Sequence, residues 1–471
     1  MKTKDSNELR DNSSENPPLN RVTRRSLPKS NVALLWDESF LWGLMALKAL
    51  RANGLPFELI NSEDIREGRL HSYSMLFVPG GWASNKLKTL GGDGVNGIRE
   101  FVRNGGSYLG FCGGAGLATL DGMGLLNIKR KPTKERVPSF SGRIYLNIDE
   151  HPIWNGLLES SHESRVTSHE LKDKKEPENL SLATHRTPLI FHAWWPSQFL
   201  VEDSGTKMLA AYGNALPDSF SSDLNTGDVR STGNWSEFEA VYHINLNPER
   251  LLNEPAVIEG TFGNGKVVLS LVHFDTPGDA NGTTVLRNLW NYLSGQKPEV
   301  RSQKSDEKSP GSGICSLNSE ISDLEAAVSE LTSLGTRNFL WFWRNPMLLQ
   351  WRRGIRGLEY CTLYIMIKEI AEILCQTSAL PDFRASEPSI RDNLSRIREL
   401  LRPFIDKAKR LLVLERLALQ NNHITYEKCD DPEIQKLRTD LFSNSKSYGG
   451  IFKELIGEID KLLYLLLKQQ G

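Results

Sequence analysis

Residues 107–120 read SYLGFCGGAGLATL, and this stretch decides the fold. An apolar run suited to a buried strand leads to Cys112, and a run suited to a helix follows it. Gly110 and Gly114 stand at i−2 and i+2 from the cysteine, where larger side chains would collide in a tight strand-to-helix turn. The stretch therefore predicts a nucleophile elbow within an α/β domain.

The position of Cys112 at a helix start has chemical consequences. Unpaired N–H groups and the helix dipole at such a start favour the thiolate form of a cysteine. The upstream run SMLFVPGG (74–81) is a buried strand ending in Gly80 and Gly81, whose N–H groups would face the same site together with that of Gly113. The alternative is a small buried cysteine beside a tight turn, which a GxCxG pattern alone does not exclude.

A cysteine nucleophile needs a base, and His273 is the best placed histidine. It closes the second run of the hairpin AVIEGTF-GNG-KVVLSLVHF (256–274), and Asp275 follows two residues later. Residues i and i+2 of an extended segment point to one side, so Asp275 is positioned to orient the imidazole. The competing interpretation is a histidine and an aspartate in a surface turn.

Composition divides the chain into four segments. Residues 1–30 are polar and predict a disordered tail, whereas 31–294 alternate strand-like and helix-like runs, which is typical of an α/β sheet. Residues 295–316 form a polar linker. Residues 317–471 predict an all-α bundle, because apolar residues recur every three or four positions, as in the series Ile321, Leu324, Val328 and Leu331.

Within the helical segment we expect no strand. Pro346 and Pro403 are expected to mark breaks or helix starts, and Cys361 and Cys375 to lie in the core. The run RNFLWFWRNPMLLQWRRGIRG (337–357) interleaves tryptophans with arginines. It suits a nucleic acid or membrane surface, but on a near-neutral protein a buried aromatic stripe with a solvated basic face is favoured.

The overall numbers are those of a water-soluble protein. The chain has 471 residues, 39% hydrophobic and 24% charged, with a net charge of −1. This balance gives no reason to expect a nucleic-acid partner. There is no apolar run long enough for a membrane span or a signal peptide, and five scattered cysteines suit a reducing cytoplasm. No cluster has metal-ligand spacing, so we expect neither metal nor cofactor.

Three motifs together resemble a known family. VPGGW (78–82), IREFVRNGGSYLGFCGGAG (98–116) and GNGKVVLSLVHFD (263–275) are similar to class I glutamine-amidotransferase-like domains, and most of all to the N-terminal domain of biotin–protein ligases. The resemblance covers roughly 31–294 and implies a flavodoxin-like sheet. It implies a catalytic triad of Cys112, His273 and Asp275, with an oxyanion loop at Gly80, Gly81 and Gly113. The ligase module is not part of it, since no GRGRxGR-like loop occurs.

Two positions depart from the glutaminase pattern. Gly116 stands where GxCxGxQ has glutamine, and Asp275 replaces the glutamate of H-x-E. Both weigh against glutamine hydrolysis, so we expect a cysteine hydrolase acting on another small amide or peptide-like acyl substrate. The alternatives are a non-catalytic binding or regulatory module whose helical domain binds a protein partner, and a cysteine peptidase.

The run PLIFHAWWPSQFL (188–200) offers further candidates for the substrate site. His192 and Trp194 are placed to line a pocket over Cys112, although packing in the core and at its rim is the favoured role of this run. His151, in DEHPIWNGL (149–157), is expected to be structural rather than a ligand.

Overall fold

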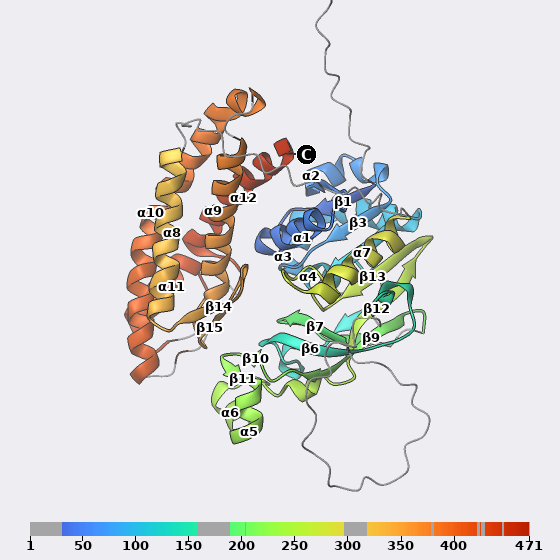
Figure 1. Cartoon of the computed structure of the whole chain (residues 1–471), viewed down its shortest axis with the longest axis horizontal. Coiled ribbons are helices and arrows are strands. Elements are labelled where there is room, and N and C mark those ends of the chain that lie inside the picture. Colours follow the sequence, from blue (N-terminus) through green and yellow to red (C-terminus); the bar gives the residue numbers. More distant parts are fainter. Residues whose placement is uncertain are drawn as a thin grey trace, which may run out of the picture.

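The computed structural model describes residues 31–157, 189–202, 204–295, 318–377, 381–421, 424, 429–430, 431–444 and 447–470. The predicted tail (1–30) and nearly all of the predicted linker lie outside these residues. An α/β part built on one large sheet lies beside a mainly helical part, with α9 (Gly357–Thr377) and α12 (Gly450–Gln470) between the sheet and the outer helices (Figure 1). The predicted α/β fold followed by a helical region is confirmed.

Five parallel strands form the half of the sheet that carries the elbow, in the order β13-β4-β3-β1-β2. They are β1 (Val32–Leu35), β2 (Glu58–Ile60), β3 (Met75–Val78), β4 (Ser107–Phe111) and β13 (Gly265–Ser270). The strands β1, β3 and β4 are buried along their whole length, because helices cover parallel sheets on both faces. The carboxyl ends of these strands meet at one edge, where the loops after β1, β3 and β4 converge.

Antiparallel strands extend this sheet beyond β13 to a total of eleven strands. They are β6 (Phe140–Ile148), β7 (Leu189–Trp194), β9 (Lys207–Ala215), β10 (Phe220–Ser221), β11 (Leu224–Asn225) and β12 (Pro255–Phe262). As predicted, β12 and β13 form a hairpin, which turns at Gly263 with φ 61°. A separate antiparallel pair joins β5 (Ile128–Arg130) to β8 (Phe199–Val201).

The helices of the α/β part follow the expected alternation with strands. They are α1 (Phe40–Ala52), α2 (Ser62–Arg66), α3 (Ala83–Arg103), α4 (Gly113–Leu117), α5 (Thr226–Thr232), α6 (Trp235–Tyr242) and α7 (Ala280–Ser294). The apolar spacing of residues 97–106 indicates a helix only from residue 97, but α3 begins earlier, at Ala83, with a kink at Gly91. The glycine pair Gly91-Gly92 hides this helix from sequence patterns, because glycine is a poor helix former.

The second part consists largely of helices that pack around apolar faces. They are α8 (Asn318–Arg337), α9, α10 (Pro381–Asn421), α11 (Pro432–Phe442) and α12. Every member of the series Ile321, Leu324, Val328 and Leu331 is buried, as the spacing predicts. Pro403 lies inside α10 rather than at a break, and Cys375 is exposed although we expected a core position; Cys361 is buried.

The prediction that this part has no strand is wrong. Strands β14 (Trp341–Asn345) and β15 (Leu348–Trp351) form an antiparallel hairpin that turns at Pro346. Aromatic side chains suit a pleated strand, and an Asn-Pro pair suits a turn, so the local chemistry agrees with the hairpin. Its apolar content resembles that of a buried helix, which is why spacing alone did not distinguish the two.

The two parts are packed against each other through one continuous hydrophobic core. The rings of Trp351 and Trp195 stack with centroids 4.9 Å apart, and Phe40 packs edge-on against Tyr448 at 5.2 Å. Gln350 of β15 is buried and accepts a hydrogen bond from Ser141 Oγ of β6 at 2.9 Å. The helical part is therefore an integral part of the folded chain. No helix within the described residues is both long and apolar enough to cross a membrane.

Candidate active site

The elbow has the strained geometry that the sequence predicts. Cys112 stands between β4 and α4 with φ 47° and ψ −102°, a region that non-glycine residues rarely occupy. Its N–H donates to the Ser270 carbonyl of β13 at 2.8 Å, which fixes the turn to the sheet. The residue is half-buried.

Glycines allow the elbow to approach the loop after β3 very closely. A Cβ on Gly113 would lie 1.9 Å from the Gly81 carbonyl oxygen, and one on Gly114 would lie 2.0 Å from that of Val78. No side chain fits at either position. This requirement is the physical reason for the Gly-Gly pair after the cysteine.

His273 and Asp275 lie together at the end of β13, and both are buried. His273 Nδ1 is 3.0 Å from Asp275 Oδ1, so the shorter acid reaches the imidazole without a glutamate. The other ring nitrogen, Nε2, is buried and makes no hydrogen bond within the described residues. A surface turn, the competing interpretation of this pair, is therefore wrong.

Charge around His273 keeps its ring protonated. Burial alone would lower the pKa of His273, but the Asp275 carboxylate and the Cys112 sulfur outweigh burial and raise it to about 10. Cys112 is among the groups that raise it, so the sulfur lies near the imidazole. Trp42 of α1 covers the ring, with centroids 4.7 Å apart, and shields it from water.

The loop after β3 presents backbone donors at the elbow. Gly81 has φ 113°, and a Cβ there would lie 2.5 Å from the Glu38 carbonyl oxygen. In the part of the chain that the structure describes, the N–H groups of Gly80, Gly81 and Gly113 make no hydrogen bond, whereas Gly114 N donates to Pro79 O at 3.1 Å. Unsatisfied N–H groups around a nucleophile suit a developing oxyanion.

A buried lysine that the sequence did not single out lies behind this loop. Lys86 Nζ donates to the Asp37 carbonyl oxygen at 3.0 Å and to Ser39 Oγ at 2.5 Å. Burial lowers the pKa of Lys86 to about 7, although the charges of four groups partly oppose it: Asp37, Glu38, Asp460 of α12 and Cys112. The lysine thus connects the elbow with the helical part.

The two predicted pocket residues on β7 have different surroundings. His192 Nδ1 lies 2.7 Å from Asp279 Oδ2 and its side chain is 23% exposed, so it stays accessible. Trp194 is buried, and its indole N–H donates to Thr276 Oγ1 at 3.0 Å. Trp194 therefore packs the loop of the candidate catalytic histidine. His151 accepts a hydrogen bond from Ile153 N and lies 3.3 Å from Glu259, which is a structural setting.

Cationic and phenolic groups gather on the other side of the cysteine. A Cβ on Gly116 would lie 3.0 Å from Arg130 Nη1, so an arginine occupies the space beside the position where glutaminases carry glutamine. Arg136 and Tyr212 lie close enough to Cys112 for its sulfur to raise the pKa of each. Burial is the larger influence on both: it lowers the pKa of Arg136 and raises that of Tyr212.

Sequence reasoning missed Trp42, Lys86, Arg130, Arg136 and Tyr212. They come from separate helices, strands and loops, so no spacing rule links them to Cys112. The weak signal available was the acidic loop WDES (36–39), which follows a buried strand at the same sheet edge as the elbow.

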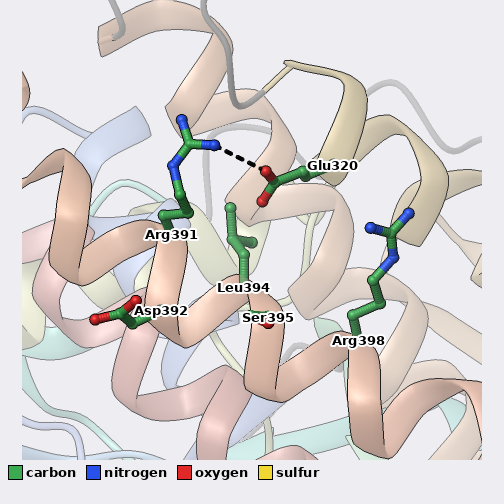
Figure 2. A pocket seen from close by; sticks show the side chains of 6 residues that line it. All are labelled: Glu320, Arg391, Asp392, Leu394, Ser395 and Arg398. Carbon is green, nitrogen blue, oxygen red and sulfur yellow. Dashed lines mark hydrogen bonds and ion pairs between the residues drawn. The ribbon is translucent and has the colours of Figure 1, made fainter.

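A surface pocket lies elsewhere, between α8 and α10, away from the predicted triad. Figure 2 shows its lining, in which Arg391 and Glu320 point toward each other and form an ion pair at 3.1 Å. The lining consists of Glu320, Arg391, Asp392, Leu394, Ser395 and Arg398. Within the described ranges, no three His, Cys, Asp or Glu side chains gather closely enough to hold a metal ion.

Comparison with known proteins supports the resemblance. Residues 59–121, from β2 through the elbow, match the family model described as the N-terminal domain of biotin–protein ligase, and the predicted resemblance is confirmed there. No curated protein sequence matches the chain.

Solved structures similar to this chain include amidotransferases. One is a glutamine amidotransferase (16% identity, 57% of this chain and 100% of that chain, TM-score 0.33). Another is a protein assigned as a component of GMP synthase from Thermoplasma acidophilum (11% identity, 57% of this chain and 96% of that chain, TM-score 0.34). A third is a thua-like protein from Bacteroides uniformis (11% identity, 57% of this chain and 94% of that chain, TM-score 0.32). Each likeness concerns the fold alone.

Proposed function

We propose that this chain is a cysteine-dependent hydrolase or acyltransferase of the glutamine-amidotransferase-like class, acting on an amide or related acyl substrate other than glutamine. One observation carries the proposal. The half-buried Cys112, on a positive-φ elbow, adjoins a buried His273 whose other nitrogen is held by Asp275. A buried histidine ring nitrogen without a hydrogen-bond partner is costly unless it serves chemistry.

The reaction would follow the Cys-His-acid pattern. The imidazolium of His273 favours the thiolate of Cys112, which attacks the acyl carbon and forms the S–C bond. The carbonyl oxygen would take the negative charge and accept hydrogen bonds from the N–H groups of Gly113 and Gly81. His273 would then donate its proton to the leaving nitrogen as the C–N bond breaks, and water would release the acyl group and restore the thiol.

Glutamine itself is disfavoured as the substrate. The arginine beside Gly116 occupies the space next to the position where glutaminases carry a glutamine side chain, so the acyl pocket differs from theirs. The alternative, a binding module that lost its chemistry, makes the opposite prediction for cysteine reactivity, and one experiment separates the two.

The experiment is competitive alkylation at pH 6. Cys112 should react with iodoacetamide at least about tenfold faster than the exposed Cys375 of the same chain, because the neighbouring His273 imidazolium activates its sulfur. His273→Gln should reduce the rate to that of Cys375. Peptide mass spectrometry measures both sites in one sample.

A matched control is His151→Gln, since His151 also faces an acid but contacts Glu259 rather than the elbow. It should leave Cys112 alkylation unchanged. A second readout is the acyl adduct that p-nitrophenyl acetate leaves on Cys112, which intact-protein mass spectrometry detects and Cys112→Ser should abolish. Equal rates at Cys112 and Cys375 together with no adduct would favour the binding module.

A further inference from the structure

Two arginines beside the elbow lack the partners that such groups usually have. Arg130 ends β5, and within the described residues its guanidinium makes no hydrogen bond or ion pair, although Nε is buried. Guanidinium groups are normally paired with carboxylates, phosphates or several carbonyls when water is excluded. An unpaired one at a candidate active site therefore requires an explanation.

Arg136 has only neutral partners. Its Nη1 donates to Ser197 Oγ at 2.7 Å and its Nη2 to Thr133 Oγ1 at 2.8 Å, while Nε is buried without a partner. Burial and then the neighbouring Arg130 lower the pKa of Arg136, and the one group that raises it is Cys112. No carboxylate is among the charged groups that act on it.

The acid that pairs with the residue after Arg130 is already engaged. Glu254 pairs with Lys131, the residue after Arg130, at 2.6 Å. Serine and threonine hydroxyls hold the Arg136 fork in place without neutralising its charge. Two like charges therefore lie side by side in a partly desolvated setting, which is unfavourable until an anion joins them.

The position of the pair relative to the nucleophile fits a substrate contact. Arg130 Nη1 lies 3.0 Å from where a Cβ of Gly116 would be, and Gly116 N donates to the Cys112 carbonyl at 2.9 Å. The hydroxyl of Tyr212 is buried without a partner and belongs to the same surroundings, since the Cys112 sulfur acts on its pKa. Both arginines are half-buried, so each side chain keeps some exposed surface near the elbow, and the Tyr212 hydroxyl lies buried behind them without a partner among the described residues.

We propose that Arg130 and Arg136, together with the Tyr212 hydroxyl, form a subsite that binds a carboxylate of the substrate whose acyl group is transferred to Cys112. The planar fork of a guanidinium group offers two parallel N–H donors to the two oxygens of a carboxylate. The proposal rests on the proposed function and narrows it to acidic substrates, such as an amide of a dicarboxylic acid or an acylated amino acid.

The test uses two alkylating reagents that differ in charge. Iodoacetate carries a carboxylate in place of the amide of iodoacetamide, so the ratio of their rates at Cys112 reports the subsite. The ratio at the exposed Cys375 gives the reference within the same sample. For wild type we expect the Cys112 ratio to exceed the Cys375 ratio roughly ten- to a hundredfold, the range expected for a charge-assisted hydrogen bond.

Variants assign this preference to the arginines. Arg130→Gln and Arg136→Gln should each bring the Cys112 ratio close to that of Cys375, because dividing the iodoacetate rate by the iodoacetamide rate cancels any change in the reactivity of the thiol itself. Arg130→Lys, which keeps the charge without the planar fork, should be intermediate. The matched control is Arg143→Gln, because Arg143 is exposed and paired with Asp218 at 2.8 Å.

The outcomes separate the subsite from the catalytic proposal. If Cys112 is activated but its ratio equals that of Cys375, or if both glutamine variants keep the wild-type ratio, the subsite is wrong and the hydrolase proposal stands. If Cys112 is inert to both reagents, the proposed function fails and the subsite is decided in Cys112→Ser protein. There, succinate should raise the melting temperature, and Arg136→Gln should abolish this effect; no rise in Cys112→Ser would overturn the subsite.

Discussion

Burial lowers the pKa of two titratable side chains near Cys112, but the net pKa shifts of the two are opposite. Asp275 and Cys112 raise the pKa of His273 by more than burial lowers it, so this pKa rises to about 10. The acidic neighbours of Lys86 raise its pKa by less than burial lowers it, so this pKa falls to about 7. The elbow thus lies between a cation that persists well above neutral pH and one that titrates near it.

Replacing Lys86 by methionine should change how stability depends on pH. Below pH 7 Lys86 is protonated in both the folded and the unfolded chain, and above about pH 10.5 it is neutral in both. The free-energy cost of burying its positive charge is therefore complete at low pH and disappears between pH 7 and about pH 10.5. Wild type should therefore gain stability relative to Lys86→Met as pH rises from 7 to 10.5, by a few kcal/mol at most. Guanidinium unfolding at pH 6, 8 and 10 measures the difference.

The exposed Lys88 of the same helix supplies the control. Lys88→Met should show a difference from wild type that is independent of pH. A flat difference for Lys86→Met as well would mean that Lys86 is protonated to the same extent in the folded and unfolded chain.

Sequence reasoning at this scale reached the residues that motifs carry. The flanking glycines identified Cys112, and the i+2 spacing from His273 identified Asp275. The sequence does not predict Lys86, Tyr212 or the two arginines as neighbours of the thiol. Their closeness to it depends on how separate helices, strands and loops come together at one edge of the sheet. The exposed position of Cys375 was also missed, since a helical run does not say which face a single thiol occupies.

At the scale of elements, the elbow depends on the contact between α4 and the loop after β3. Gly113 faces the Gly81 carbonyl at a distance that leaves no room for a methyl group. The strained cysteine is held by this contact and by the bond to Ser270. A change in the glycine should therefore disturb both the fold and the position of Cys112.

Gly113→Ala should lower the free energy of unfolding by about 1–3 kcal/mol, because the chain must shift to relieve the clash. It should also slow alkylation of Cys112 more than alkylation of Cys375. Gly457→Ala in α12 is the matched control, since no atom lies within 4 Å of the added methyl group. That substitution should stabilise the protein by up to about 1 kcal/mol. Urea unfolding and the alkylation assay test both; an unimpaired Gly113→Ala protein would contradict the described approach.

Predicting elements from the sequence worked where periodicity and turns agreed. The strands β3 and β4 and the β12–β13 hairpin were predicted, because short apolar runs are bounded by glycine turns, whereas the antiparallel strands β6 to β11 were not. The β14–β15 hairpin was not predicted, because its aromatic residues satisfy a buried helix as well as a strand. The start of α3 was missed for the opposite reason, since glycines lower the helical signal of a helix that tertiary packing supports.

At the scale of the whole molecule, three tryptophan rings join the helical part to the candidate catalytic histidine. Trp351 stacks on Trp195, Trp195 meets Trp42 edge-on at 6.1 Å, and Trp42 covers His273. Trp195 has φ 49°, so its strained backbone relies on these contacts. The helical part thereby supports the cysteine site from outside the sheet.

Removing one ring should loosen this connection. Trp351→Ala should reduce the free energy of unfolding by roughly 2 kcal/mol, less than for a fully buried tryptophan, and should increase amide exchange in residues 189–202 and 36–47. Hydrogen-exchange mass spectrometry measures the second effect.

Trp343→Ala on the same hairpin is the control, because that ring is 37% exposed and contacts Tyr364 within the helical part. It should leave exchange in both segments unchanged. Equal exchange in the two variants would show that the stack on Trp195 does not restrain the site.

The stack between Trp351 and Trp195 also bears on how such a protein is inherited. A helical part exchanged for another domain by recombination would uncover the faces of Trp195 and Phe40, which its own chain now covers. Those apolar faces would then attract other molecules before a new partner could evolve to fit them. The two parts are accordingly expected to descend as one heritable unit, with substitutions on either side of the contact selected in pairs.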